Sequence, residues 1–246
     1  MLFRSDPLGG TINGQPRLNA QEVRSILSYA AHQTGITRAA IRLPIGVPMK
    51  AFITVVNNPN ADSVAPTVLG TFRTGEATLF SWDVAVQKAR TVIFYSRHDF
   101  LNFGLRLAMS VRTVGFLAQC NYPPGINGNL QGPFNGQQEM FSGLLGNHCN
   151  PAAITLNPAV TCPPSPPPPN PALPNGITIF PGAFGLYRNG VLIGAIGVSG
   201  DGVDQDDLAG AAGTHDFLAP NSIRADHFFF RGTRLPYAKF PRDPGG

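Results

Sequence analysis

Charged residues are scarce in this chain of 246 residues, with 18 Lys and Arg and 14 Asp and Glu, or 13% of the total. That is about half of the roughly 25% found in typical soluble domains. The composition therefore argues against a charged, disordered tail protein. The formal net charge of +4 is small, and there is no run of Lys or Arg, so we expect no nucleic-acid partner.

Long apolar runs are also lacking, and no stretch approaches the roughly 18 residues of a membrane span. Residues 1–10 have no apolar core typical of a signal peptide. We therefore expect a cytoplasmic protein, or a periplasmic or secreted one if a signal lies upstream of this sequence. Three cysteines, Cys120, Cys149 and Cys162, are too few for a disulfide scaffold, and their pairing stays open.

Proline and glycine, by contrast, are abundant, with 24 and 28 residues. The prolines concentrate in residues 121–181, which contain a single charged side chain, Glu139. We interpret this segment as a long insertion within one domain that spans residues 1–246, with an irregular C-terminal extension over 216–246. The alternative is a flexible linker between two domains. It is disfavoured because the roughly 65 residues that follow are too few to form a core alone.

Apolar periodicity predicts a series of helices and strands on both sides of this insertion. Asn19 as N-cap with Glu22 three residues later starts a helix that we expect to stop at Gly35. A hairpin with an Asn189-Gly190 turn is the strongest short-range strand signal. The other predicted elements are strands over 52–56 and 68–72, and helices from Thr78 or Ser81 to about Tyr95, over 99–113 and over 205–212. Hairpins alternating with helices predict the α+β class, with an antiparallel sheet and helices packed on it.

Two groups of polar residues are candidates for ligand contact. Glu76, Thr78 and Ser81 lie at the start of the second helix, where hydroxyl groups either cap the helix or bind a carboxylate or phosphate. An acidic group follows the second hairpin, and its simplest interpretation is charge that stabilises a helix N-terminus: Asp201, Asp204, Asp206 and Asp207. Gly194, Gly197 and Gly200 do not form a dinucleotide motif, and we expect them to allow close backbone packing.

The five histidines are scattered, and none has the spacing of a helical metal site. His32, near the end of the first helix, is the best candidate iron ligand, because imidazole can ligate haem iron. The alternative is an ordinary surface or core histidine. His148 and Cys149 are adjacent in the proline-rich segment, where nothing further in the sequence indicates a metal site.

Two motifs in order resemble the GlcG/HbpS-like haem-binding family. The first is T-F-R-T-x-E-A-T followed by S-W-D-V-A-V-Q-K-A-R-T, over residues 71–91. The second is Y-R-N-G-V-L-I-G-A-I-G-V-S-G over residues 187–200, followed by Gln205-Asp206. The resemblance covers most of residues 18–119 and 177–215. The loop at Gly182 departs from the usual family pattern, and the proline-rich insertion and the C-terminal extension are absent from short family members.

The resemblance implies a compact domain with profilin- or PAS-like α-β-α layers of about five strands, assembly into homo-oligomers, and binding of haem or a similar planar ligand. It implies an apolar slot beside the second helix, with Arg73 or Lys88 facing the propionates and His32 on the iron. The full set of expected ligand-binding residues is His32, Arg73, Glu76, Thr78, Ser81, Lys88, Gly182 and Asp206, and the expected metal ligand is His32.

A haem-handling module is therefore the leading hypothesis, and two alternatives remain open. One is a structural assembly module without chemistry of its own, in which the insertion and tail extend an interface. The other is an enzyme that acts on a small oxidised carbon acid through Glu76, Ser81 and Asp206. The sequence offers no nucleophile–base pair, which favours a binding function over catalysis.

Overall fold

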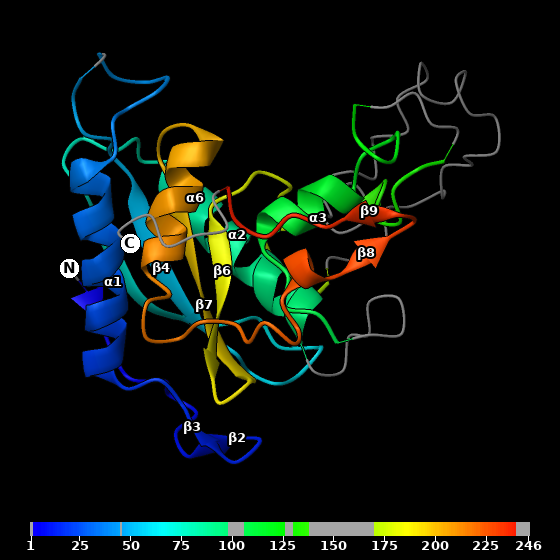
Figure 1. The fold of residues 1–246 in the computed structure, drawn as a ribbon. Helices are drawn as coiled ribbons and strands as arrows, with labels where there is room; N and C mark the ends of the chain where they lie inside the picture. Colours follow the sequence, from blue (N-terminus) through cyan, green and yellow to red (C-terminus); the bar gives the residue numbers. More distant parts are fainter. Residues whose placement is uncertain (1, 45, 98–105, 126–129, 138–169, 240–246) are drawn as a thin grey trace, which may run out of the picture.

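The computed structural model describes residues 2–44, 46–97, 106–125, 130–137 and 170–239 (Figure 1). Its elements before the proline-rich segment are β1 (Leu2–Phe3), β2 (Thr11–Ile12), β3 (Gln15–Pro16), α1 (Ala20–Ile36), β4 (Phe52–Asn57), β5 (Val68–Arg73), α2 (Ser81–Ser96) and α3 (Val111–Leu117). After it come β6 (Ala183–Arg188), β7 (Val191–Ser199), α6 (Val203–Ala212), the 3-10 helix η1 (Ala225–His227), β8 (Phe229–Phe230) and β9 (Thr233–Arg234).

The core of the fold is a five-stranded antiparallel sheet in the order β1-β5-β4-β7-β6. Helices α1 and α6 cover one face, and α2 covers part of the other (Figure 1). The predicted α+β class with about five strands is confirmed. Strand β4 pairs with β7 from Phe52↔Ser199 to Asn57↔Gly194, so strands from either side of the proline-rich segment share one sheet.

Helix α1 begins at the predicted cap. The Asn19 side chain accepts a hydrogen bond from the Glu22 backbone N–H at 2.9 Å, and the Glu22 carboxylate accepts one from the Asn19 N–H at 2.9 Å. The buried face of α1, which includes Val23, Ile26 and Leu27, packs against the sheet. The predicted stop at Gly35 is wrong by one residue, because the helix runs through it to Ile36.

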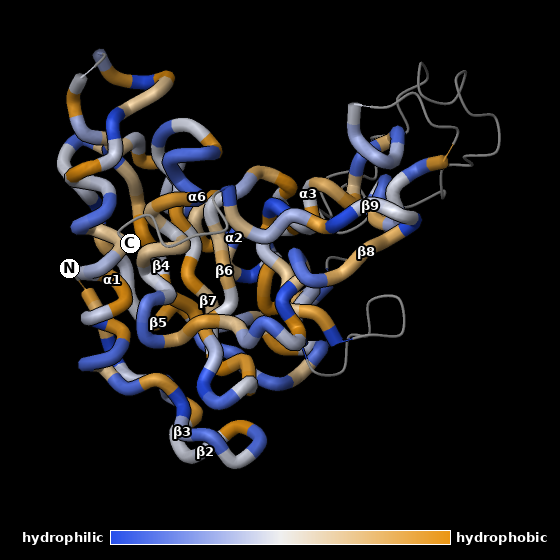
Figure 2. The backbone as a smooth tube through the Cα atoms, viewed as in Figure 1, coloured by the Kyte–Doolittle hydropathy of each residue, from blue (hydrophilic) through white to orange (hydrophobic). Residues whose placement is uncertain are grey.

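The second hairpin forms at the predicted turn. Asn189 and Gly190 have φ angles of 47° and 79°, the left-handed conformation that suits a two-residue hairpin turn. Strands β6 and β7 are almost completely buried, since helices cover both of their faces. Figure 2 shows the hydrophobic residues gathered along these central strands.

Of the helix predicted over 99–113, residues 111–113 are helical and residues 106–110 are not. Residues 98–105 lie outside the described residues. Ala108 instead exchanges backbone hydrogen bonds with the C-terminal region, accepting from Ala225 N–H at 3.1 Å and donating to Ile223 C=O at 2.7 Å. Helix α3 begins only at Val111, where the Ser110 side chain caps it. Backbone pairing with the C-terminal region takes the place of the first part of the predicted helix. The periodicity of the sequence does not indicate this pairing.

The C-terminal segment packs beside α3 and adds a second small core. Leu235 is buried there with residues from α3 and from the segment around Leu173. Phe228 and Phe230 pack partly against this core, whereas Phe229 is 70% exposed on β8. No described helix is long and apolar enough to cross a membrane.

Close packing of α2 on β7 depends on a glycine. A Cβ atom built on Gly197 would lie 2.1 Å from the Ala85 carbonyl oxygen and 3.0 Å from the Ala89 nitrogen. These are backbone atoms of α2, which cannot move independently of the helix. This confirms the expectation that the glycines of this strand permit a close backbone approach.

Gly197→Ala should therefore lower the free energy of unfolding by about 1–3 kcal/mol, the usual range for overpacking, as measured by urea denaturation. Gly35→Ala is the matched control, because no atom lies within 4 Å of a Cβ built there. Alanine in a helix should raise stability by up to about 1 kcal/mol. Equal stability of both variants would contradict the close-packing account.

Candidate functional site

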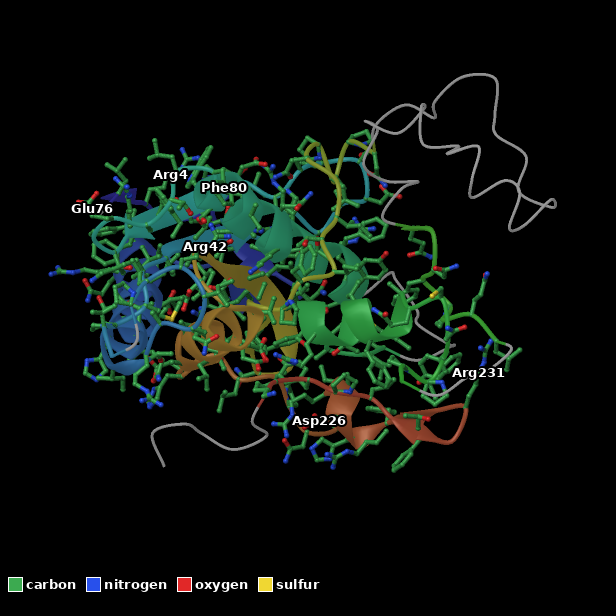
Figure 3. The ribbon with its side chains drawn as sticks, turned by 90° about the horizontal axis from the view of Figure 1, so that it is seen from above. Arg4, Arg42, Glu76, Phe80, Asp226 and Arg231 are labelled. Atoms are coloured by element: carbon green, nitrogen blue, oxygen red, sulfur yellow. The ribbon has the colours of Figure 1, made fainter. Side chains whose placement is uncertain are left out.

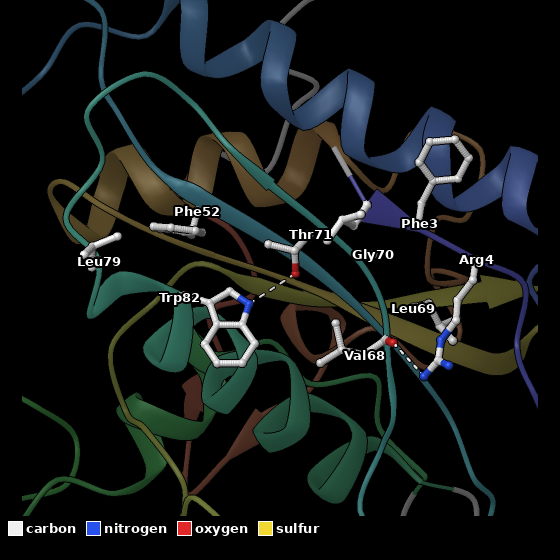
Figure 4. Close-up of a pocket in the computed structure, with 10 residues that line it drawn as sticks. Phe3, Arg4, Phe52, Val68, Leu69, Gly70, Thr71, Leu79 and Trp82 are labelled. Carbon is white, nitrogen blue, oxygen red and sulfur yellow. Dashed lines mark hydrogen bonds between the residues drawn. The ribbon is translucent and has the colours of Figure 1, made fainter.

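An apolar groove lies on the part of the sheet that α2 leaves bare. Helix α2 packs chiefly on β4, β7 and β6, so among the described residues no helix packs over the β5 and β1 side of this face. The groove has a volume of about 720 Å³. It is shown in Figure 4 and is lined by Leu2, Phe3, Arg4, Phe52, Val68, Leu69, Gly70, Thr71, Leu79 and Trp82.

The groove walls expose large apolar side chains to solvent. Leu79 is 73% exposed and Trp82 is 45% exposed, although both belong to the start of α2 or the turn before it. The Trp82 indole N–H donates to the Thr71 hydroxyl at 3.3 Å, which holds the ring against the floor (Figure 4). Arg4 marks one end, where its guanidinium donates to the Val68 carbonyl at 3.4 Å. Contiguous exposed apolar surface of this kind marks a binding site more often than a free surface.

Four of the predicted ligand-binding residues lie together at the start of α2, next to Leu79 of the groove. Arg73 donates from Nε and Nη2 to the Ala77 carbonyl at 2.9 and 2.6 Å. Thr78 and Ser81 share a hydrogen bond between their hydroxyls at 2.7 Å. Glu76 is exposed in the same turn, on the same side of the molecule as Arg4 (Figure 3).

Two cations border this end of the groove. The Arg73 guanidinium lies 5.7 Å from the centre of the Phe52 ring, which lines the groove. Arg42 lies 4.9 Å from the ring of Phe80, an exposed residue directly after Leu79. The arrangement combines a flat apolar surface with positive charge at its margin, which suits a planar ligand that carries carboxylates.

Three other predicted residues meet in the interior instead. The Lys88 ammonium donates to the Asp206 carboxylate at 2.9 Å and to the Val198 carbonyl at 2.8 Å. Both side chains are almost fully buried, with exposed fractions of 2% and 4%. A Cβ on Gly182 would lie 2.9 Å from the Lys88 nitrogen and 2.8 Å from the Asp206 Cβ, so the glycine leaves room for the pair.

This pair connects the two sides of the sheet, because Lys88 belongs to α2 and Asp206 to α6. Burial lowers the pKa of Lys88 and raises the pKa of Asp206, while their mutual attraction counters both shifts. A lysine held in this way is not available to a propionate in the groove. The geometry assigns the pair to holding the fold together.

The remaining acidic residues near α6 also bond within the protein. The Asp201 carboxylate accepts from the backbone N–H groups of residues 40, 41 and 42 at 2.6, 3.1 and 3.1 Å. Arg112 donates to Asp204 and Asp207 at 2.8 Å each. Among the described residues, no group of three or more His, Cys, Asp or Glu side chains could hold a metal ion.

His32 stands apart from both groups. It is exposed on α1, which packs on the opposite sheet face from α2 and is not part of the groove lining. His98, His148, Cys149 and Cys162 lie outside the described residues. Sequence reasoning missed Leu79 and Phe52 as groove residues. The available signal was the cluster of large apolar residues Leu79, Phe80 and Trp82 around the start of α2, where all three side chains are exposed.

The sequence profile of a family described as "Haem degrading protein HbpS-like" matches residues 53–215, which is more than half of the chain. The chain belongs to this HbpS-like family. The resemblance seen in the two sequence motifs is thereby confirmed. No curated protein matches the chain in sequence.

Solved structures of similar fold include proteins of low identity to this HbpS-like chain. A PduOC–haem complex has 16% identity and a TM-score of 0.47, covering 83% of this chain and 97% of that one. HbpS has 14% identity and a TM-score of 0.44, covering 85% and 95%. The Klebsiella pneumoniae protein ORFY has 17% identity and a TM-score of 0.41, covering 84% and 96%.

Proposed function

We propose that this HbpS-like protein binds haem in the groove beside α2. The observation that carries the proposal is the groove itself, an open apolar hollow of about 720 Å³ with cations near its margin. Its size falls within the range of about 300–1,000 Å³ that is usual for small-molecule sites. Membership of a family described as haem-degrading supports the same ligand.

The residues of the groove fit the porphyrin ring. Phe52 and Trp82 present aromatic surface, and Leu79 adds aliphatic surface that solvent reaches in the free protein. Arg4 and Arg73 are placed to face carboxylates, since each has guanidinium N–H groups beyond those bonded to backbone carbonyls. Arg73 thus keeps the role that the sequence predicted, while Lys88 does not fit it because the ammonium is buried.

Ligation of the iron needs other side chains than recognition of the porphyrin ring. Among the described residues that line the groove, there is no His, Cys, Met or Tyr, the side chains that usually ligate haem iron. The assignment of His32 as ligand stays a sequence-based prediction. Bound haem would supply redox-active iron, and this chain's described residues would bind and orient the ring.

Titration of the protein with haem tests the proposal. We expect a shift of the Soret band that saturates at one haem per groove, and quenching of Trp82, the single tryptophan of the chain. Because the groove recognises the ring, iron-free protoporphyrin should bind as well. An unchanged Soret band at micromolar haem would contradict the proposal.

The alternative enzyme built from Glu76, Ser81 and Asp206 lacks an assembled site. Asp206 is buried with Lys88, Ser81 bonds to Thr78, and Glu76 faces solvent. The geometry therefore favours binding over general acid–base chemistry by these three groups.

A further inference from the structure

Two arginines bond to consecutive residues of the turn that leads from β5 into α2. Arg73 donates to the Ala77 carbonyl at 2.9 and 2.6 Å. Arg42 donates to the Thr78 hydroxyl at 3.4 Å. The next residue of this β5–α2 turn, Leu79, lines the groove. Both guanidinium groups are therefore held beside one end of the groove.

A third cation lies at the same turn. A Cβ atom built on Gly75 would lie 3.4 Å from the Lys50 ammonium nitrogen, so this side chain runs against the turn. None of Arg42, Lys50 and Arg73 forms an ion pair with any described residue. Glu76 is the one acidic residue of the turn, and it is exposed (Figure 3). The turn thus has an excess of positive charge that the described chain does not neutralise.

The backbone that carries Arg42 is held by a buried carboxylate. Asp201 is 6% exposed and accepts from the backbone N–H groups of residues 40, 41 and 42 at 2.6, 3.1 and 3.1 Å. Hydrogen bonds to an ionised carboxylate are roughly twice as strong as those between neutral groups. Because the Arg42 side chain itself is exposed, its place at the turn depends on this anchor.

The two ends of the groove differ in charge. Arg4 bonds to the carbonyl of Val68, the first residue of β5, and it is the single charged residue of the described lining. Arg73 is the last residue of β5, roughly 16 Å further along the strand. One guanidinium therefore stands at the first end and three cations at the second. A flat ligand whose carboxylates are grouped on one edge is attracted more strongly to the second end.

We propose that the β5–α2 turn is the carboxylate-binding end of the groove, where Arg42, Lys50 and Arg73 bind the carboxylates and Asp201 positions Arg42. The proposal rests on the proposed haem function of the groove and adds an orientation to it, with the propionates at the turn and not at Arg4. A guanidinium has five N–H donors, so both arginines keep donors for a carboxylate beyond those bonded to the turn.

Affinities for haem and for haem dimethyl ester, measured in the same mild detergent, test the proposal. The ester keeps the ring and lacks the charged propionates. The wild type should bind haem about 10- to 100-fold more tightly than the ester, the range expected for hydrogen bonds to a charged group. Equal affinity for the two ligands would overturn this proposal and leave the groove as the haem site, whereas binding of neither would overturn both.

Arg42→Gln and Arg73→Gln should each lower the preference for haem while the affinity for the ester stays unchanged. Arg4→Gln should lower the preference less, and a larger loss there would overturn the orientation. Arg24→Gln is the matched control for the loss of one positive charge, because Arg24 is exposed on α1 at the opposite face of the sheet. It should keep the preference of the wild type.

Asp201→Asn tests the positioning role. An amide places an NH₂ group where the carboxylate has its second oxygen, so at least one of the three backbone bonds is lost. The preference for haem should fall towards that of Arg42→Gln, and adding Asp201→Asn to Arg42→Gln should lower it no further. Equal weakening of haem and ester binding would show a purely structural role and overturn the positioning. Arg42→Gln changes an exposed side chain, so it tests the carboxylate-binding end even if Asp201→Asn folds poorly.

Discussion

Lys88→Met should lower the free energy of unfolding by about 3–5 kcal/mol, because it leaves the buried Asp206 carboxylate without its counter-ion. Methionine nearly matches the length of lysine, so packing around the stem changes little. Urea denaturation at pH 7 measures the effect. Lys239→Met is the matched control, since Lys239 pairs with Asp204 at 3.0 Å in a partly exposed site. Its loss should be below about 1 kcal/mol.

The double variant Lys88→Met with Asp206→Leu separates loss of charge balance from loss of packing. It should recover most of the stability, because replacing both partners of a buried ion pair with apolar groups is often neutral or stabilising. A double variant as unstable as the sum of the two single variants would contradict this account of the pair.

The pH dependence of Lys88→Met has a definite sign. Burial raises the pKa of Asp206 and Lys88 lowers it, so without Lys88 the folded chain takes up this proton at a higher pH than either the wild type or the unfolded chain. The folded state is then favoured as pH falls from neutral towards the ordinary carboxyl pKa near 4. The deficit of the variant against the wild type should therefore shrink over that range, as measured by urea midpoints at several pH values.

Trp82→Ala should weaken haem binding by about 10- to 100-fold, the equivalent of about 1.5–3 kcal/mol of lost apolar contact. The side chain is 45% exposed in the free protein, so the variant should fold with little loss of stability. A Soret titration of the variant measures the change in affinity.

Phe229→Ala is the matched control for the loss of an exposed aromatic ring. Phe229 is 70% exposed on β8 and does not line the groove. Its replacement should leave haem affinity unchanged.

His32→Ala distinguishes the sequence-based assignment of His32 as iron ligand from recognition of the ring by the groove. Loss of binding in His32→Ala with wild-type affinity in Trp82→Ala would contradict the groove as the haem site.

Local signals explain why much of the sheet and its helices could be predicted from sequence. Asn19 and Glu22 form a capping box within four residues, and Asn189-Gly190 determines a turn by itself. The helix expected over 99–113 does not form at residues 106–110, because Ala108 bonds to residues more than a hundred positions away. Periodicity reports which residues are apolar, and it does not report which distant segment competes for the backbone.

The candidate site could be predicted only in part, because the groove forms where α2 leaves the β5 and β1 side of the sheet uncovered. The motif residues Arg73, Thr78 and Ser81 do lie next to the groove, and their nearness in sequence made that grouping visible. Lys88 and Asp206 are 118 positions apart, and their pairing follows from how α2 and α6 pack on the sheet. A sequence pattern cannot tell a buried lysine of this kind from one that faces a ligand.

The most direct test of the groove as the haem site is iron anomalous diffraction from crystals of the protein grown with haem. We predict an iron peak above β5 and β1, with the porphyrin ring against Trp82 and Phe52. An iron peak on the outer face of α1 beside His32, with the groove free of haem, would contradict the account.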